Sequence, residues 1–172
     1  ITRDANLPFI EDGAVAIEGT RIKEIGATKD MKEKYKEAEY IDARGGVIMP
    51  AFINTHEHIY SAMARGLSIK GYHPKGFLDI LDGQWWTIDR KLTPEQIRYS
   101  AADTMISCIR NGVTTIFDHH ASFGHIKDSL FTIAEVAKEL GVRSCLCYEV
   151  SDRDGMEKAK EAVMENAAFI KY

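Results

Sequence analysis

Two histidines separated by one residue have the chemistry of metal ligands. An apolar run that starts at Val47 and has the length of a buried strand ends in His56 and His58, with Glu57 between them. Because strand side chains alternate between two faces, both imidazoles are expected to point one way and Glu57 the other. Two imidazoles on one face supply two ligands for Zn²⁺ or a similar divalent ion. A pair of surface histidines is the alternative that so short a motif leaves open.

Four other side chains are candidates for contact with a substrate. Arg65 follows the histidine pair and can bind a carboxylate or a ring oxygen. Trp85 can form one wall of a pocket for an aromatic ring. His119 and His120 follow a second apolar run and are expected near the same edge. Each has a structural alternative: a solvated loop arginine, a packed tryptophan, or histidines that only form structural hydrogen bonds. Asp118, beside the histidines, can likewise have either a substrate-site role or a structural hydrogen-bonding role.

The elements that position these residues alternate between strand and helix after residue 47. Thr93, Pro94 and Gln96 form a capping box with proline at the first helical position, and Gly112 ends the helix that follows. This alternation predicts a parallel α/β sheet, in which functional groups lie at the carboxyl ends of the strands. The expected strands span 47–58, 113–117 and 142–150, and the expected helices span 93–112, 127–140 and 156–172.

The first 48 residues have a different pattern, which predicts a separate β-rich domain. Residues 13–18 and 21–26 are short strands joined at Gly19-Thr20, a hairpin signal. The charge-rich stretch 29–38 is expected to be a short exposed helix, and 40–43 another strand. We therefore divide the chain into a first domain of residues 1–48 and a second of residues 49–172.

Composition restricts the partners. With 22 basic and 26 acidic residues the net charge is −4 and no basic stripe is present, which disfavours nucleic acid. No apolar run approaches the ~20 residues that span a membrane, and no secretion signal opens the chain. The three cysteines, Cys108, Cys145 and Cys147, suit a reducing cytoplasm. The last two are expected to be small buried residues on one strand face rather than metal ligands.

The second domain is short for the fold that its pattern suggests. Residues 49–172 hold three strand–helix units, whereas a closed eight-stranded barrel needs about 250 residues. We therefore expect the sequence to be an incomplete portion of a longer protein.

The segment Pro50-Ala51-Phe52-Ile53-Asn54-Thr55-His56-Glu57-His58 resembles the first barrel strand of the amidohydrolase superfamily, with Ala51 where that family more often has glycine. The segments 92–95 and 111–115 resemble its deaminase and chlorohydrolase branch. Within that branch, the stretches 58–62, 65–68, 85–86, 117–122 and 147–155 are similar to the SsnA-type aminohydrolases.

The resemblance implies a metal-dependent (β/α)₈ TIM barrel flanked by a small β-sandwich, here truncated. It implies hydrolysis of a carbon–nitrogen bond, deaminating a purine-like or other nitrogen heterocycle, at one divalent metal, zinc or else iron. His56 and His58 would be two of the ligands. The other ligands and the catalytic glutamate belong to later strands, so this portion alone is expected to be inactive.

Two kinds of alternative remain open. Within the enzymes, the protein could be a chlorohydrolase or a cyclic amidase, also acting on a small molecule. From another class, it could be a noncatalytic binding protein with the amidohydrolase fold. Homodimers are expected only by analogy with this branch.

Overall fold

The structure is a computed structural model that describes residues 1–172. The chain forms two compact units, Ile1–Pro50 and Ala51–Tyr172, and each is described by itself. No helix in the structure combines the length and the apolar character needed to cross a membrane.

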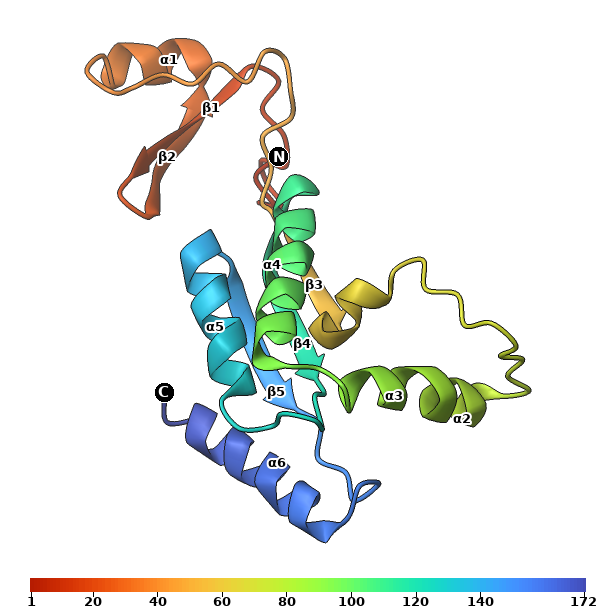
Figure 1. Cartoon of the computed structure of the whole chain (residues 1–172). Helices are drawn as coiled ribbons and strands as arrows, with labels where there is room; N and C mark the ends of the chain where they lie inside the picture. The colour runs from red at the N-terminus through yellow and green to blue at the C-terminus, as the bar shows by residue number, and fades with distance from the viewer. The chain divides into compact units, whose positions relative to one another are not determined.

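The first unit is built on a hairpin followed by a helix (Figure 1). Strands β1 (Gly13–Glu18) and β2 (Arg21–Ala27) pair antiparallel, and Gly19 in the turn has a positive φ of 60°. Helix α1 (Thr28–Lys34) follows directly. The hairpin and the helix are confirmed, but the strand expected at residues 40–43 is wrong. Those residues are exposed and pair with no other strand. An extended segment without a pairing partner is not stable as a β-strand.

The second unit contains a three-stranded parallel sheet in the order β3–β4–β5. These strands are β3 (Phe52–Glu57), β4 (Val113–His120) and β5 (Arg143–Tyr148). The parallel α/β arrangement is confirmed. Two boundaries differ most from expectation: β3 begins at Phe52 rather than Val47, and β4 continues through the polar residues up to His120. Hydrogen bonding to β5 extends β4 over these polar residues, and His120 is the register partner of Tyr148.

Three long helices follow the strands (Figure 1). They are α4 (Pro94–Arg110), α5 (Ser129–Leu140) and α6 (Met156–Phe169). The predicted capping box is present at α4, where Thr93 Oγ1 accepts from Gln96 N at 3.3 Å and Gln96 Oε1 accepts from Thr93 N at 3.0 Å. Gly141, with a φ of 71°, ends α5 in the left-handed conformation.

The hydrophobic core lies between the sheet and these helices. Its fully buried members include Ile97, Met105, Ile116, Leu130 and Ile133. The opposite face of the sheet is open, and the side chains on it, Ile53, Phe117, Cys145 and Cys147, are exposed. The expectation that the two strand cysteines are buried is therefore wrong, because they alternate with the buried residues Leu146 and Tyr148 and face away from the helices.

A partly helical segment connects β3 to α4. It starts as the 3₁₀ helix η1 (Ile59–Ala64), runs through an irregular stretch, and ends in α2 (Phe77–Ile80), the π-helical turn η2 (Leu81–Trp85) and α3 (Trp86–Asp89). Two ion pairs fasten its end to the loop after β5. Arg90 binds Asp154 with a closest distance of 2.7 Å, and the buried Asp89 binds Arg153.

Candidate metal and substrate site

His56 in β3 and His58, the first residue after that strand, converge as the alternation predicts. His56 Nε2 and His58 Nε2 lie 3.0 Å apart, with the rings edge to face and their centroids 4.9 Å apart. Two neutral imidazoles this close can form one hydrogen bond between these nitrogens, in which one donates its N–H and the other accepts. Alternatively, both nitrogens can offer their lone pairs to a cation between them. The donor set and its direction therefore fit two positions around a divalent metal ion.

The orientation of His58 is set by a contact with the neighbouring strand. Its Nδ1 lies 3.0 Å from the backbone carbonyl oxygen of His119. A carbonyl oxygen only accepts, so Nδ1 carries the proton and Nε2 keeps the free lone pair that a metal requires. This is the tautomer expected of a metal-binding histidine.

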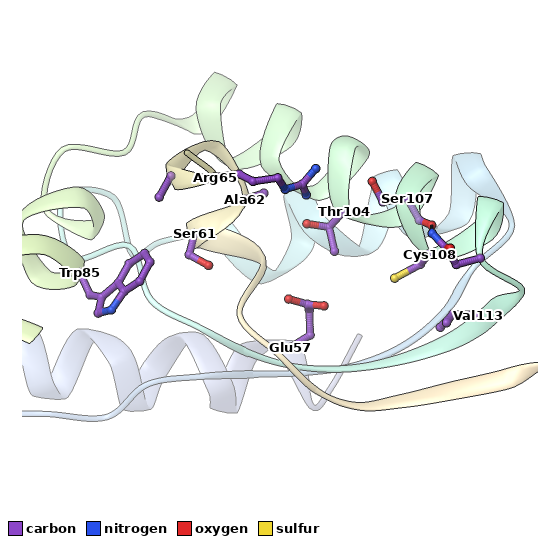
Figure 2. A pocket seen from close by; sticks show the side chains of 11 residues that line it. Glu57, Ser61, Ala62, Arg65, Trp85, Thr104, Ser107, Cys108 and Val113 are labelled. Atoms are coloured by element: carbon purple, nitrogen blue, oxygen red, sulfur yellow. Dashed lines mark hydrogen bonds between the residues drawn. The ribbon is translucent and has the colours of Figure 1, made fainter. Parts of the chain in front are cut away.

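Glu57 points away from the two imidazoles, as expected from sequence. Its carboxylate accepts from Asn54 Nδ2 at 2.7 Å and from the backbone N–H of His58 at 3.0 Å. It projects into a cavity of about 360 Å³ beside helix α4. Figure 2 shows Thr104 and Cys108 on the wall opposite Glu57. The carboxylate thus steadies the backbone of the histidine segment and does not join the imidazole pair.

Arg65 and Trp85 line this same cavity, on the Glu57 side of the strand (Figure 2). Arg65 Nη2 also forms an exposed ion pair with Asp103 Oδ2 at 3.2 Å. Arg65 and Trp85 therefore lie on the opposite side of the strand from the imidazoles of His56 and His58. For both, the structural alternative, an exposed arginine and a packed tryptophan, agrees better with their location.

His119 and His120 have opposite environments because they are successive residues of one strand. His119 is exposed, and its ring centroid lies 5.6 Å from that of His58, on the metal-ligand side. His120 is fully buried: its Nε2 lies 3.0 Å from Ser122 Oγ, its Nδ1 has no hydrogen-bond partner, and burial lowers its pKa to about 3. A ring with no exposed surface argues against the expected contact of His120 with a substrate.

Asp118 and Cys147 complete the edge of the sheet. The carboxyl group of Asp118 is buried, which raises its pKa to about 7, and its Oδ1 accepts from the backbone N–H of Ile59 at 2.7 Å. Cys147 is the register partner of His119 and is exposed on the same face. Sequence reasoning missed Cys147 because it treated the strand cysteines as core; the alternation with Leu146 and Tyr148 was the available signal.

A further cluster was also missed. Arg153 lies against the ring of Trp86, binds the buried Asp89, and donates from Nε to Glu149 Oε1 at 2.9 Å. Its guanidinium carbon lies 3.8 Å from the ring centroid of Phe123. No spacing rule connects residues 89 and 153, so only the fold reveals this cluster.

The described residues provide only part of a metal site. No group of three or more histidine, cysteine, aspartate or glutamate side chains is arranged to hold a metal ion. The imidazoles of His56 and His58 remain the best donors, and Nδ1 of His58 is already hydrogen-bonded, as is usual for a metal-binding histidine.

Comparison with known proteins identifies the family. The pattern of the amidohydrolase family matches residues 47–171, so the chain belongs to that family. The resemblance noted from the segment that begins at Pro50 is thereby confirmed.

Similar proteins of known name are deaminases. The chain is 30% identical over 158 residues to the 5'-deoxyadenosine deaminase of Methanocaldococcus jannaschii, covering 92% of this chain and 34% of the relative. It is 29% identical to the 5-methylthioadenosine/S-adenosylhomocysteine deaminase of Thermococcus sibiricus, with 92% and 34% coverage. The chain thus spans about a third of the length of the curated relatives that it matches.

Solved structures agree on the fold. Escherichia coli guanine deaminase superposes with a TM-score of 0.74 at 20% identity, over 99% of this chain and 41% of that one. The atrazine chlorohydrolase of Arthrobacter aurescens, solved with zinc and atraton, superposes with a TM-score of 0.68 at 25% identity, over 86% of this chain and 33% of that one.

Proposed function

We propose that the protein is a metal-dependent hydrolase of carbon–nitrogen bonds, which deaminates a purine-like or related nitrogen heterocycle. One observation carries this proposal: His56 Nε2 and His58 Nε2 converge at 3.0 Å on the open face of the sheet. The relatives named as deaminases of adenosine derivatives support the reaction class. In this proposal the first unit belongs to a small β-sandwich, and the second supplies the first three units of a (β/α)₈ barrel.

The residues of this chain would bind and orient. His56 and His58 would hold one divalent ion, and zinc is favoured because a related chlorohydrolase was solved with it. Such an ion lowers the pKa of water, so that hydroxide is available near neutral pH. His119, exposed beside His58, is the candidate for contact with the substrate. The general acid and base are not among the residues placed here.

The first test is metal content. Full-length protein carrying His56→Ala and His58→Ala together is compared with the wild type by plasma emission, with His73→Ala, an exposed loop histidine, as control. The proposal requires about one zinc or iron per chain in the wild type and the control, and loss of metal in the double variant. Equal metal in all three, or none in any, contradicts it and favours a noncatalytic binding protein.

The second test is the product. Adenosine derivatives, guanine and chlorinated triazines are incubated with metal-loaded protein while ammonia and chloride are measured separately. Ammonia release from a purine supports the proposal. Chloride release from a triazine would instead support the chlorohydrolase alternative, which the structural likeness to the atrazine enzyme keeps open. A homodimer, a cytoplasmic location and a place among the SsnA-type aminohydrolases remain predictions.

A further inference from the structure

Sheet pairing is interrupted around His56. The ladder between β3 and β4 pairs Asn54 with Ile116 and then resumes with Glu57 opposite Asp118, with an irregular register between them. His56 has no register partner on β4, and His58 lies beyond the end of β3 at φ −132° and ψ 79°. Backbone ladder bonds alone therefore do not fix the direction of these imidazoles.

Two successive residues of β4 supply the missing contacts. The carbonyl oxygen of His119 accepts from His58 Nδ1 at 3.0 Å, and the carboxylate of Asp118 accepts from the N–H of Ile59 at 2.7 Å. The first contact orients the imidazole ring. The second holds the peptide that follows it, at the start of η1, where a helix has unsatisfied N–H groups. His58 is thus held on both sides by β4.

A carboxylate is a costly group at position 118. Asp118 is 3% exposed, and its second oxygen, Oδ2, has no hydrogen-bond partner. Burying a carboxyl group with one bonded oxygen is unfavourable compared with an apolar side chain such as Ile116, two residues earlier on the same face. The only hydrogen-bond partner of this side chain is the peptide next to His58, which indicates that its contribution lies there rather than in packing.

We propose that Asp118 is a positioning residue for the metal ligand His58. By holding the Ile59 peptide, it keeps the ring of His58 where Nδ1 meets the His119 carbonyl and Nε2 faces His56. This inference rests on the proposed function, since it requires His58 to bind a metal. It assigns Asp118 no contact with either metal or substrate.

Two substitutions separate the acceptor from the charge. Asp118→Ala removes the acceptor of the Ile59 N–H, whereas Asp118→Asn keeps an oxygen of the same shape and replaces the unpartnered Oδ2. The dissociation constant for Zn²⁺ is measured on the full-length chain by competition with a chromophoric chelator. Asp118→Ala is expected to weaken binding about 10- to 100-fold, the range found when a group supporting a metal ligand is lost. Asp118→Asn is expected to remain close to the wild type.

A second readout needs no metal. Long-range ¹H–¹⁵N spectra of the metal-free protein report which ring nitrogen of His58 is protonated. The wild type and Asp118→Asn are expected to show His58 protonated at Nδ1. Asp118→Ala is expected to show a mixture of both tautomers, because the ring no longer stays against the His119 carbonyl. A residue that only stabilised the fold would not shift this equilibrium.

Glu165→Ala is the matched control. Glu165 is also a buried carboxylate that accepts backbone N–H groups, from Asp128 and Leu130 at 2.9 Å, but it lies on α6. It should lower stability without altering zinc affinity or the His58 tautomer. The inference is overturned if Asp118→Ala binds zinc and protonates His58 like the wild type, or if Glu165→Ala weakens zinc binding equally. If the His56→Ala, His58→Ala double variant binds zinc normally, the proposed function fails as well, which distinguishes the two failures.

Discussion

At the scale of single residues, burial keeps His120 neutral. Its ring has no exposed surface, Nδ1 has no partner, and the pKa is lowered to about 3, compared with about 6.5 for an unperturbed histidine. Because the folded-state pKa is depressed, the unfolded chain binds a proton more readily. The stability that this neutral ring contributes is therefore fully present above pH 6.5 and is lost as the pH falls from about 6.5 towards 3.

The resulting prediction concerns stability between pH 7 and pH 5. Protonation of His120 in the unfolded chain should reduce the free energy of unfolding by about 2 kcal/mol over this range, at about 1.4 kcal/mol per pH unit. Urea unfolding of the wild type and of His120→Gln measures this, and the variant should lack that part of the slope. His73→Gln, an exposed histidine, should keep it. Parallel pH profiles for the wild type and His120→Gln would contradict the assignment.

The ion pairs Asp89–Arg153 and Arg90–Asp154, at the end of α3, should contribute unequally to the free energy of unfolding. Arg153→Leu leaves the carboxylate of Asp89 buried and unpaired, which should lower the free energy of unfolding by about 3–5 kcal/mol. Arg90→Leu breaks a partly exposed pair with Asp154 and should cost about 1 kcal/mol or less. Chemical unfolding of both variants measures the difference. Similar losses of unfolding free energy in both variants would show that the buried ion pair contributes no more to stability than the partly exposed one.

Residue-level predictions from sequence succeeded where the spacing was local. His56 and His58 are two residues apart, so alternation alone predicts their convergence. The assignment of His120 could not succeed in the same way, because the expected strand stopped at residue 117 and left its face undefined. The tertiary pairing of β4 with β5 decides that face.

At the scale of elements, the N-terminus of α5 is stabilised from another helix. The carboxylate of Glu165 on α6 accepts from the N–H groups of Asp128 and Leu130, each at 2.9 Å. A negative charge at this end also interacts favourably with the helix dipole. The bonds tie the start of α5 to the middle of α6.

Glu165→Ala should therefore destabilise the second unit by about 2–3 kcal/mol, because it leaves the buried N–H of Leu130 and the partly buried N–H of Asp128 without their charged acceptor. Glu165→Gln keeps one acceptor oxygen and should cost less. Glu157→Ala on the exposed side of α6, where the carboxylate only pairs with Lys160, is the control and should change stability little. Thermal unfolding followed by circular dichroism gives the ranking, and equal losses for Glu165→Ala and Glu157→Ala would be inconsistent with a buried cap.

The sequence was informative about elements that carry their own end signals. The capping box at Thr93 and the glycine after Leu140 predicted the limits of α4 and α5 to within a few residues. The cap from Glu165 was beyond prediction, because the two helices meet only after the chain has folded. Residues 40–43 have the β-propensity of a strand, but no neighbouring strand pairs with them.

At the scale of the whole molecule, the described residues provide two good metal ligands and no group of three. We predict that the 172-residue chain, purified with excess Zn²⁺ and then desalted, retains much less than one zinc per chain. A protein of the length of its relatives should retain about one. Plasma emission on both measures this, with the His56→Ala, His58→Ala double variant as the background. Stoichiometric zinc on the 172-residue chain alone would show that its donors suffice.

The class of fold and the family were accessible from the sequence because strand–helix alternation and the histidine segment are both continuous in the chain. The family match over residues 47–171 confirms the latter. The face of the sheet on which each polar group lies was less accessible. Arg65 and Trp85 both belong to the segment that connects the ligand strand to α4, yet they line the Glu57 side of that strand.

The contacts that orient His58 have a consequence for the order of events during synthesis. They join His58 and Ile59, at the junction of β3 and η1, to Glu57 and to β4, and no residue after His120 takes part in them. Because pairing with β5 extends β4 through Asp118 and His119, the imidazole pair can acquire its geometry once β5 has emerged from the ribosome and joined the sheet. A nascent chain would then present a preformed bidentate ligand to zinc before any later strand is made.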